Sequence, residues 1–85
     1  MTAQSRRLKP TRKDRVRKAI AHSARTPDSR LSDGLSLTSD LGMSALDLID
    51  LAMTVEDILR IEIDDAALKL LETVGDVLAL AGDAG

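Results

Sequence analysis

Three short motifs in this chain of 85 residues each mark the start of a helix. In each motif a Ser or Thr is followed three residues later by an Asp, and the pairs are Thr11 with Asp14, Ser44 with Asp47, and Thr73 with Asp76. The hydroxyl of such a pair caps a backbone N–H of the coming helix, and the acid caps the N–H of the Ser or Thr. Because apolar residues follow each motif at helical spacing, we predict an all-α fold.

The predicted helices follow from these starts and from the residues that break periodicity. They are expected over residues 12–24, 44–59 and 66–70, and from Thr73 to just before Gly82. Asp64 and Asp65 cap the short third helix. Residues 60–63 have the composition of a strand, but no second strand is present to pair with them, so we reject that interpretation.

A long loop is predicted between the first two helices. Pro27, Gly34 and several Ser and Asp residues interrupt periodicity over residues 25–40. A structureless loop of that length is unusual in a small domain unless it is functional or held down. We expect it to be held by Leu31, Leu35 and Leu37.

The charges divide the chain into two halves. Residues 1–30 hold ten Lys and Arg against two acids, whereas residues 31–85 hold two Lys and Arg against twelve acids. The acidic half should attract basic protein surfaces. For the basic half we expect a solvated tail and a basic first helix rather than a nucleic-acid arm, because no aromatic side chain is available for base stacking. A specific partner contact at Arg15, Arg17 and Lys18 is left open.

Composition excludes several other classes. Without cysteine there is no disulfide framework, thiolate zinc site or cysteine nucleophile. The single histidine, His22, is expected to be an exposed surface residue and not a ligand. No nucleophile–base pair or phosphate loop is present, so we do not expect an enzyme. No apolar run approaches the roughly 20 residues of a membrane span, and we expect a cytoplasmic binding module.

The predicted second helix has two apolar faces. On a helical wheel its core stripe consists of Leu48, Leu51, Ala52, Val55, Ile58 and Leu59. Leu46, Ile49 and Met53 point almost the opposite way, and we call them the apolar ridge. Asp50, Glu56 and Asp57 surround the ridge. An apolar strip bordered by one sign of charge is typical of a docking surface, unless the long loop or the third helix folds over it.

Residues 40–47, DLGMSALD, resemble the motif D-L-G-x-D-S-L-D of acyl carrier proteins. The resemblance continues without gaps through Ile49, Met53, the pair at 56–57, residues 61–63 and residues 73–76. It implies a bundle of three main helices and one short helix over residues 11–81, with a flexible basic tail at 1–10 and a C-terminal tail at 82–85. The implied inter-helix core is Leu37, Leu41, Leu51, Val55, Ile63, Leu71, Val74 and Val77.

The resemblance also implies a function. In this family a serine in the first turn of the second helix receives 4′-phosphopantetheine from coenzyme A through a phosphopantetheinyl transferase. The thiol of that arm then carries acyl or aminoacyl groups as thioesters between ligases, synthases and transferases with basic docking patches. By matching positions, the apolar ridge with Asp47, Asp50, Glu56 and Asp57 corresponds to the partner-binding surface. A monomer without nucleic-acid or membrane partners is expected, and the cargo is not specified.

The chain departs from the family at the attachment position, which Ala45 occupies. Alanine has no hydroxyl, so this chain is expected to carry no covalently attached phosphopantetheine. Ser44 is an alternative attachment site, but it is already needed as the helix cap, and the arm would swing by about 100° around the helix axis. We therefore interpret Ala45 as replacing a serine. Two origins stay open: an engineered serine-to-alanine form of a carrier, and a natural carrier-like interaction protein that is never loaded.

Overall fold

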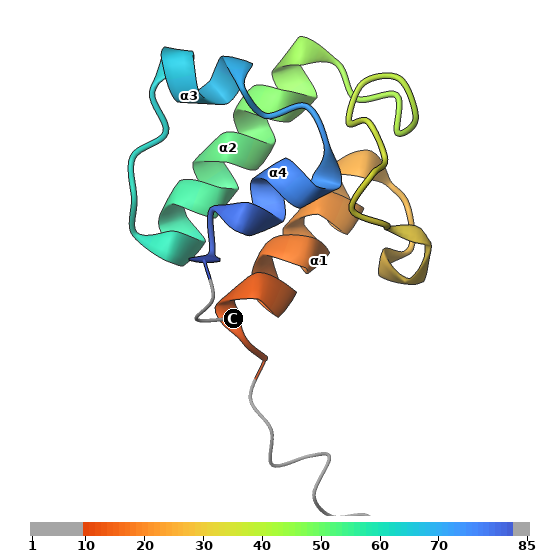
Figure 1. Cartoon of the computed structure of the whole chain (residues 1–85), viewed down its shortest axis with the longest axis horizontal. Helices are drawn as coiled ribbons and strands as arrows, with labels where there is room; N and C mark the ends of the chain where they lie inside the picture. The colour runs from red at the N-terminus through yellow and green to blue at the C-terminus, as the bar shows by residue number, and fades with distance from the viewer. Residues whose placement is uncertain (1–9, 83–85) are drawn as a thin grey trace, which may run out of the picture.

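A computed structural model describes residues 10–82 of the chain. These residues form α1 (Arg12–Ala24), a short 3-10 helix η2 (Asp28–Arg30), α2 (Ala45–Leu59), α3 (Asp65–Lys69) and α4 (Val74–Ala79) (Figure 1). Within them there is no strand, and a single isolated bridge joins Ser36 to Thr73. The predicted all-α fold with a long loop between its first two main helices is confirmed.

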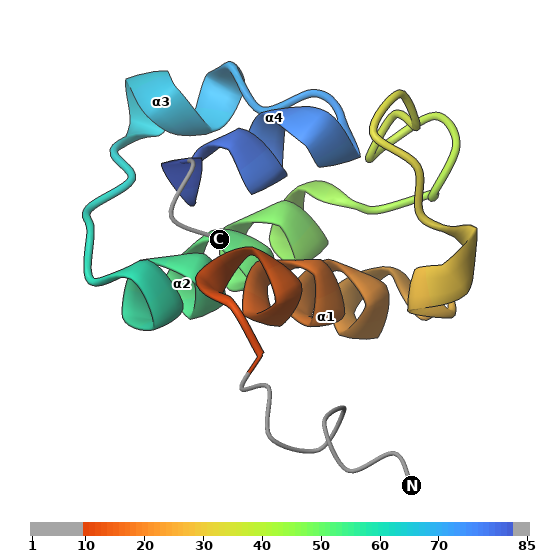
Figure 2. The same ribbon diagram turned by 60° about the horizontal axis from the view of Figure 1, so that its bottom comes forward.

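The helices form two layers. Figure 2 shows α1 and α2 side by side, with α3 and α4 across the core from them. The guanidinium of Arg12 donates to the Leu59 carbonyl oxygen at 3.3 Å, so the start of α1 lies at the end of α2. Arg25, at the end of α1, and Asp47, in the first turn of α2, line one cavity. Each helix therefore begins near the end of the other, so α1 and α2 are antiparallel.

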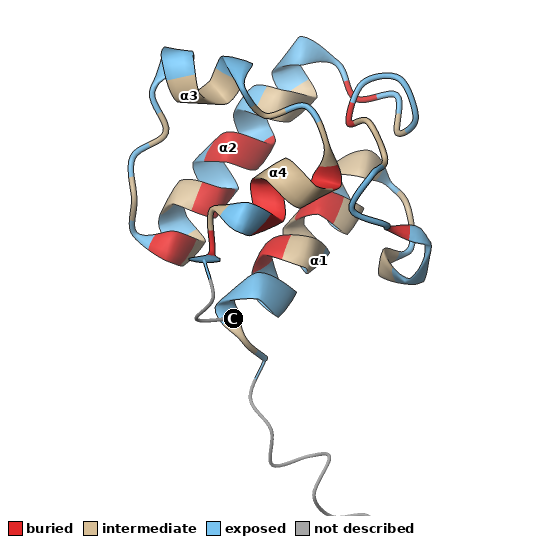
Figure 3. Ribbon diagram, in the orientation of Figure 1, coloured by how far each residue is buried: buried red, intermediate tan, exposed pale blue. Residues whose placement is uncertain are grey.

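The core lies between the two layers. Its buried apolar residues are Val16, Ile20, Leu31, Leu37, Met43, Leu51, Ala52, Val55, Leu59, Val74, Val77, Leu78 and Ala81 (Figure 3). The predicted core residues Leu41, Ile63 and Leu71 are half-buried and pack against it. Met43 was not predicted to be buried, although only 4% of it is exposed.

The long loop is held as predicted. Leu31 and Leu37 are buried, and Leu35 packs against the core. Backbone hydrogen bonds add a second attachment, because the N–H of Leu37 donates to the Glu72 carbonyl and the N–H of Val74 donates to the Leu35 carbonyl. The loop is therefore fixed to the start of α4, and through the loop α4 positions the beginning of α2.

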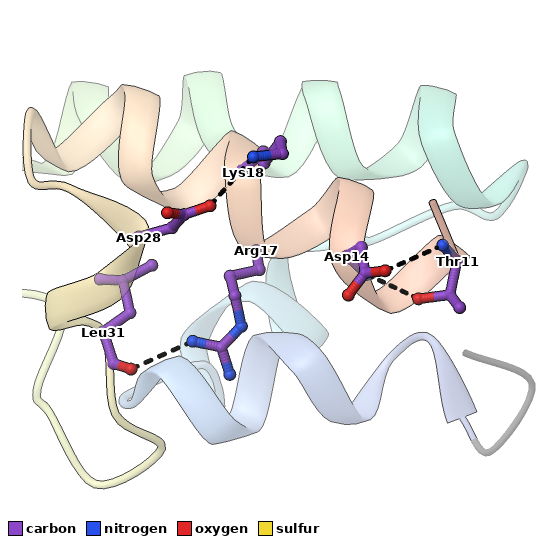
Figure 4. Close-up of polar contacts among 6 residues, drawn as sticks. All are labelled: Thr11, Asp14, Arg17, Lys18, Asp28 and Leu31. Carbon is purple, nitrogen blue, oxygen red and sulfur yellow. Dashed lines mark hydrogen bonds and ion pairs between the residues drawn. The ribbon is translucent and has the colours of Figure 1, made fainter. Parts of the chain in front are cut away.

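Side chains of α1 hold the other end of the loop. Arg17 donates to the Leu31 carbonyl oxygen at 3.0 Å, and Lys18 pairs with Asp28 at 3.1 Å (Figure 4). The sequence left a partner contact open for Arg15, Arg17 and Lys18. In the structure Arg17 and Lys18 bind residues in η2 or directly after it.

Two predicted helices differ in extent from the structure, apart from the caps Ser44 and Thr73, which lie one residue before α2 and α4. The short third helix begins and ends one residue earlier than expected. The fourth helix ends at Ala79, three residues before Gly82, because Leu80 and Ala81 make tighter bonds to the carbonyls of Val77 and Leu78. Most of both predicted tails, at residues 1–9 and 83–85, lies outside the described residues.

Candidate functional site

The first turn of α2 is defined by a reciprocal cap. The N–H of Asp47 donates to Ser44 Oγ at 3.1 Å, and the N–H of Ser44 donates to Asp47 Oδ2 at 2.9 Å. Ser44 itself has extended backbone angles, so it is the cap and Ala45 is the first helical residue. Ala45 is exposed, and the predicted register of the helix is confirmed.

The residues before the cap fix where α2 begins. Gly42 has a φ of +68°, a left-handed conformation that favours glycine. It turns the chain so that Met43 enters the core, and the N–H of Met43 donates to the Leu37 carbonyl at 3.0 Å. Asp40 closes the preceding turn by accepting the N–H of Ser36 at 2.7 Å. The start of α2 is therefore held from both sides.

The attachment chemistry of the implied cofactor does not fit residue 45 as it stands. A phosphodiester link needs a side-chain oxygen, and Ala45 has none. The neighbouring hydroxyl of Ser44 already accepts the N–H of Asp47 and sits outside the helix. The position has the exposure and the place at a helix start that an attachment site needs, but not the reactive atom.

The apolar ridge is open to solvent. The exposed fractions are 76% for Leu46, 46% for Ile49 and 59% for Met53. Among residues 10–82 neither the long loop nor α3 covers these side chains, so the covering alternative is wrong. The structure adds Leu70, which follows α3 and is 74% exposed. Because Leu70 lies in a short segment without clear periodicity, its exposure could not be predicted from the sequence.

The four predicted docking acids fall into two pairs. Asp50 and Asp57 are exposed, and no residue described in the structure forms an ion pair with them. Asp47 belongs to the cap of α2, and Glu56 is half-buried and accepts the N–H of Ile63 at 2.6 Å. Glu56 therefore also fastens the segment between α2 and α3, which the sequence did not predict.

Hydrogen bonding lowers the pKa of Asp47. The backbone N–H of Ser44 is the largest influence that lowers the pKa of Asp47 from its ordinary value, and the Ser44 side chain adds to it. The positive charge of Arg25 acts in the same direction. Arg25 ends α1 in a left-handed conformation with φ of 55°, and it lines one cavity together with Asp47 of the first turn of α2.

Other kinds of site find no support in the structure. Residues 10–82 contain no group of three or more His, Cys, Asp or Glu placed to hold a metal ion. No helix within the same residues is long and apolar enough to cross a membrane. His22 is exposed, as predicted.

Comparisons with known proteins agree with this geometry. The family model described as the phosphopantetheine attachment site matches residues 14–81. An acyl carrier protein of Thermotoga maritima is 34% identical over 65 residues, which are 76% of this chain and 80% of the relative. An acyl carrier protein of Saccharopolyspora erythraea is 31% identical over 70 residues, which are 82% of this chain and 74% of the relative.

A solved structure has the same fold. It is a protein of Mycobacterium tuberculosis assigned as an acyl carrier protein, with a TM-score of 0.70 and 30% sequence identity. The match covers 78% of this chain and 88% of the solved chain. Proteins of this kind are carriers rather than enzymes. The chain belongs to the acyl carrier protein family, whose members share the phosphopantetheine attachment domain.

Proposed function

We propose that this chain is a carrier-fold protein that docks through α2 to enzymes with basic surface patches. With serine at position 45 it would accept 4′-phosphopantetheine and present acyl or aminoacyl groups as thioesters. With Ala45 it docks without cargo. The observation that carries this proposal is the exposed position of residue 45 in the first turn of α2, next to the exposed apolar ridge.

The physical basis lies in the start of the helix and the surface beside it. A phosphodiester on residue 45 would lie at the positive end of a helix of 15 residues. Asp50 and Asp57 leave their charges free to steer a basic partner, and the ridge supplies apolar area that a partner can bury. A tether at this position would raise the effective concentration of cargo at a docked enzyme.

A second candidate function is a natural interaction protein that is never loaded. Two features favour it: Ala45 lacks the hydroxyl, and the Ser44 oxygen is engaged in the cap. In this alternative the α2 surface works alone. The gene sequence of the source organism at codon 45 separates the two functions, because a serine codon supports the loaded carrier and an alanine codon supports the unloaded protein.

The loading test uses the variant Ala45→Ser. The variant and the unchanged chain are each incubated with coenzyme A and a phosphopantetheinyl transferase, and intact mass is measured. We expect the variant to gain the mass of one phosphopantetheine group and the unchanged chain to gain nothing. If Ala45→Ser gains no mass with transferases of broad specificity, the carrier function is wrong.

The docking surface is tested in the Ala45→Ser background. Adding Met53→Glu should lower the initial loading rate at limiting protein concentration by about tenfold, because a central apolar contact is lost. Leu70→Glu is the matched control, since it makes the same change at another exposed apolar residue. Equal effects of the two substitutions would place the contact outside the ridge.

A further inference from the structure

The chain contains three methionines and no cysteine. Among side chains, peroxides react most readily with the sulfur of cysteine and methionine, so the methionine thioethers are the oxidisable groups of this protein. Met1 lies outside the described residues. The other two, Met43 and Met53, are close together in the sequence but have opposite environments.

Burial separates these two thioethers. Met53 lies on the apolar ridge of α2 and is 59% exposed, whereas Met43 belongs to the core and is 4% exposed. The backbone of Met43 is also held, because its N–H donates to the Leu37 carbonyl at 3.0 Å. An oxidant reaches a buried thioether only when the surrounding structure opens. Met53 is therefore the accessible thioether of the pair.

Met53 takes no part in the packing that holds the fold together. Among residues 10–82, neither the core nor the half-buried apolar side chains packed against it include Met53. The exposed acids Asp50 and Asp57 lie three and four residues from it on the same helix. A polar group on Met53 would be solvated in the free protein, whereas the same group on Met43 would be buried in the core. Chemical change at Met53 therefore alters the surface and leaves the fold intact.

We propose that Met53 is a site of reversible oxidation, at which a peroxide weakens docking through α2. The inference rests on the proposed function, because it assigns a regulation to the same surface. The thioether sulfur attacks one oxygen of the peroxide, so an S–O bond forms and the O–O bond breaks. With hydrogen peroxide the products are methionine sulfoxide and one water molecule. The sulfur is oxidised by two electrons, and the peroxide is reduced by the same two.

The sulfoxide weakens docking because it makes part of the apolar ridge polar. A flexible apolar side chain becomes one whose oxygen accepts hydrogen bonds from water. This oxygen must give up its water when a partner covers Met53. In the proposed complex the partner's cations are directed at Asp50 and Asp57, and its apolar surface faces the ridge. The sulfoxide oxygen is then buried without a donor, which costs binding free energy.

The exposure that admits the peroxide also admits the enzymes that reverse the reaction. Methionine sulfoxide reductases restore the thioether, and one enzyme acts on each of the two sulfoxide epimers. Two thiols supply the two electrons and become a disulfide, and the sulfoxide oxygen leaves as water. Because oxidation of Met53 leaves the fold intact, the reversal requires no refolding.

The first test measures which methionine is oxidised in the unchanged chain. The folded protein is treated with hydrogen peroxide for increasing times, the reaction is stopped with catalase, and peptides containing each methionine are quantified by mass spectrometry. We expect Met53 to be oxidised at least about tenfold faster than Met43. In urea-denatured protein the two rates should become similar. Circular dichroism of the protein oxidised at Met53 should match that of the untreated protein.

The second test measures docking in the Ala45→Ser form. Peroxide is removed before coenzyme A and a phosphopantetheinyl transferase are added, so the transferase itself is not oxidised. We expect oxidation to lower the initial loading rate at limiting protein concentration by about fivefold. Treatment with reductases for both epimers should restore the original rate.

Three variants in the Ala45→Ser background locate the effect. Met53→Leu keeps an apolar side chain but has no thioether at position 53, so its loading rate should be the same before and after peroxide. Adding Leu70→Met to that variant supplies an exposed thioether outside the ridge, and its oxidation should also leave the loading rate unchanged. Met53→Gln carries a polar group without any oxidant, so it should load more slowly than the Ala45→Ser form before peroxide is added.

Three results would overturn the inference and leave the proposed function in place. The first is oxidation of Met43 as fast as Met53 in the folded chain. The second is an oxidised Ala45→Ser form that loads at its original rate. The third is a peroxide effect that persists in Met53→Leu, which would place the sensitive group elsewhere. An Ala45→Ser form that does not load even before oxidation would instead overturn the carrier function, and the regulation of docking with it.

Discussion

Ser44 and Asp47 exchange two hydrogen bonds across the first turn of α2, one from each residue's backbone N–H to the other's side chain. This pair decides which residue begins the helix. It places Ala45 on the surface and occupies the only neighbouring hydroxyl with the cap. The cap thus fixes both the geometry of the candidate site and its lack of a free reactive oxygen.

Removing the cap should destabilise the protein. Ser44→Ala loses the acceptor for the N–H of Asp47, so we expect the free energy of unfolding to fall by about 1 kcal/mol. Urea denaturation measures this change. Ala45→Ser is the matched control at the adjacent exposed position, and it should change stability by less than about 0.5 kcal/mol. Equal losses in the two variants would contradict the assignment of Ser44 as the cap.

Stability should decline in acid because of three carboxylates. Backbone N–H groups lower the pKa of Asp14, Asp47 and Asp76 below the ordinary 3.8. A group with a lowered pKa in the folded state stabilises it above the unfolded pKa, and this contribution is lost as the pH falls through the folded pKa. We therefore expect little change between pH 7 and about pH 5 and a progressive loss below about pH 4.

Urea denaturation between pH 7 and pH 3 tests this dependence. The triple variant Asp14→Asn, Asp47→Asn and Asp76→Asn keeps side-chain oxygens at the caps but cannot titrate, so its stability should fall less steeply in acid. Asp57→Asn is the control at an exposed acid that accepts no hydrogen bond from a described residue, and it should keep the slope of the unchanged chain. A triple variant with an unaltered slope would show that other groups govern the acid response.

Gly75 is constrained by the loop that crosses α4. Its N–H donates to the Asp33 carbonyl at 2.9 Å, and a Cβ at Gly75 would lie 3.1 Å from that same oxygen. Gly75→Ala should therefore lower the free energy of unfolding by about 1 kcal/mol despite the better helix propensity of alanine. Gly34→Ala, which has no atom within 4 Å of the new Cβ, should be neutral or stabilising. Thermal unfolding of both variants decides, and a more stable Gly75→Ala would refute the close packing.

Two neighbouring cations of α1 should differ in importance. Arg17 donates to the Leu31 carbonyl from a half-buried position, whereas the ammonium of Lys18 pairs with Asp28 near the surface. We expect Arg17→Ala to cost about 1 kcal/mol or more and Lys18→Ala less than about 0.5 kcal/mol. Hydrogen exchange in residues 31–35 should accelerate only in Arg17→Ala. Similar exchange rates in both variants would mean that Arg17 does not hold the loop.

Local patterns predicted the helix starts and the exposed surface. A cap such as Thr73 with Asp76 involves residues three apart, so the sequence contains the whole interaction. The apolar ridge was likewise predictable, because Leu46, Ile49 and Met53 share one face of a single helix. These features need no knowledge of how distant segments meet.

The features that the sequence did not predict depend on contacts between distant segments. Met43 is buried because the loop brings it against the core, and its local sequence carries no such signal. Glu56 binds the N–H of Ile63 across the end of α2, although its position on the helical wheel indicated a docking acid. The depression between α1 and α2, which is lined by Lys18, His22 and Asp50, needs the antiparallel packing of two helices, so the sequence did not predict it.

We infer that position 45, and not position 44, is the attachment position of this fold. The most direct measurement compares two forms of the protein, one with its hydroxyl at position 44 and the other with its hydroxyl at position 45. Each form is treated with coenzyme A and a transferase, and its intact mass is then measured. These forms are the unchanged chain, with Ser44, and the double variant Ser44→Ala with Ala45→Ser. We predict that only the double variant gains one phosphopantetheine group. A gain by the unchanged chain at Ser44, with none by the double variant, would contradict the account.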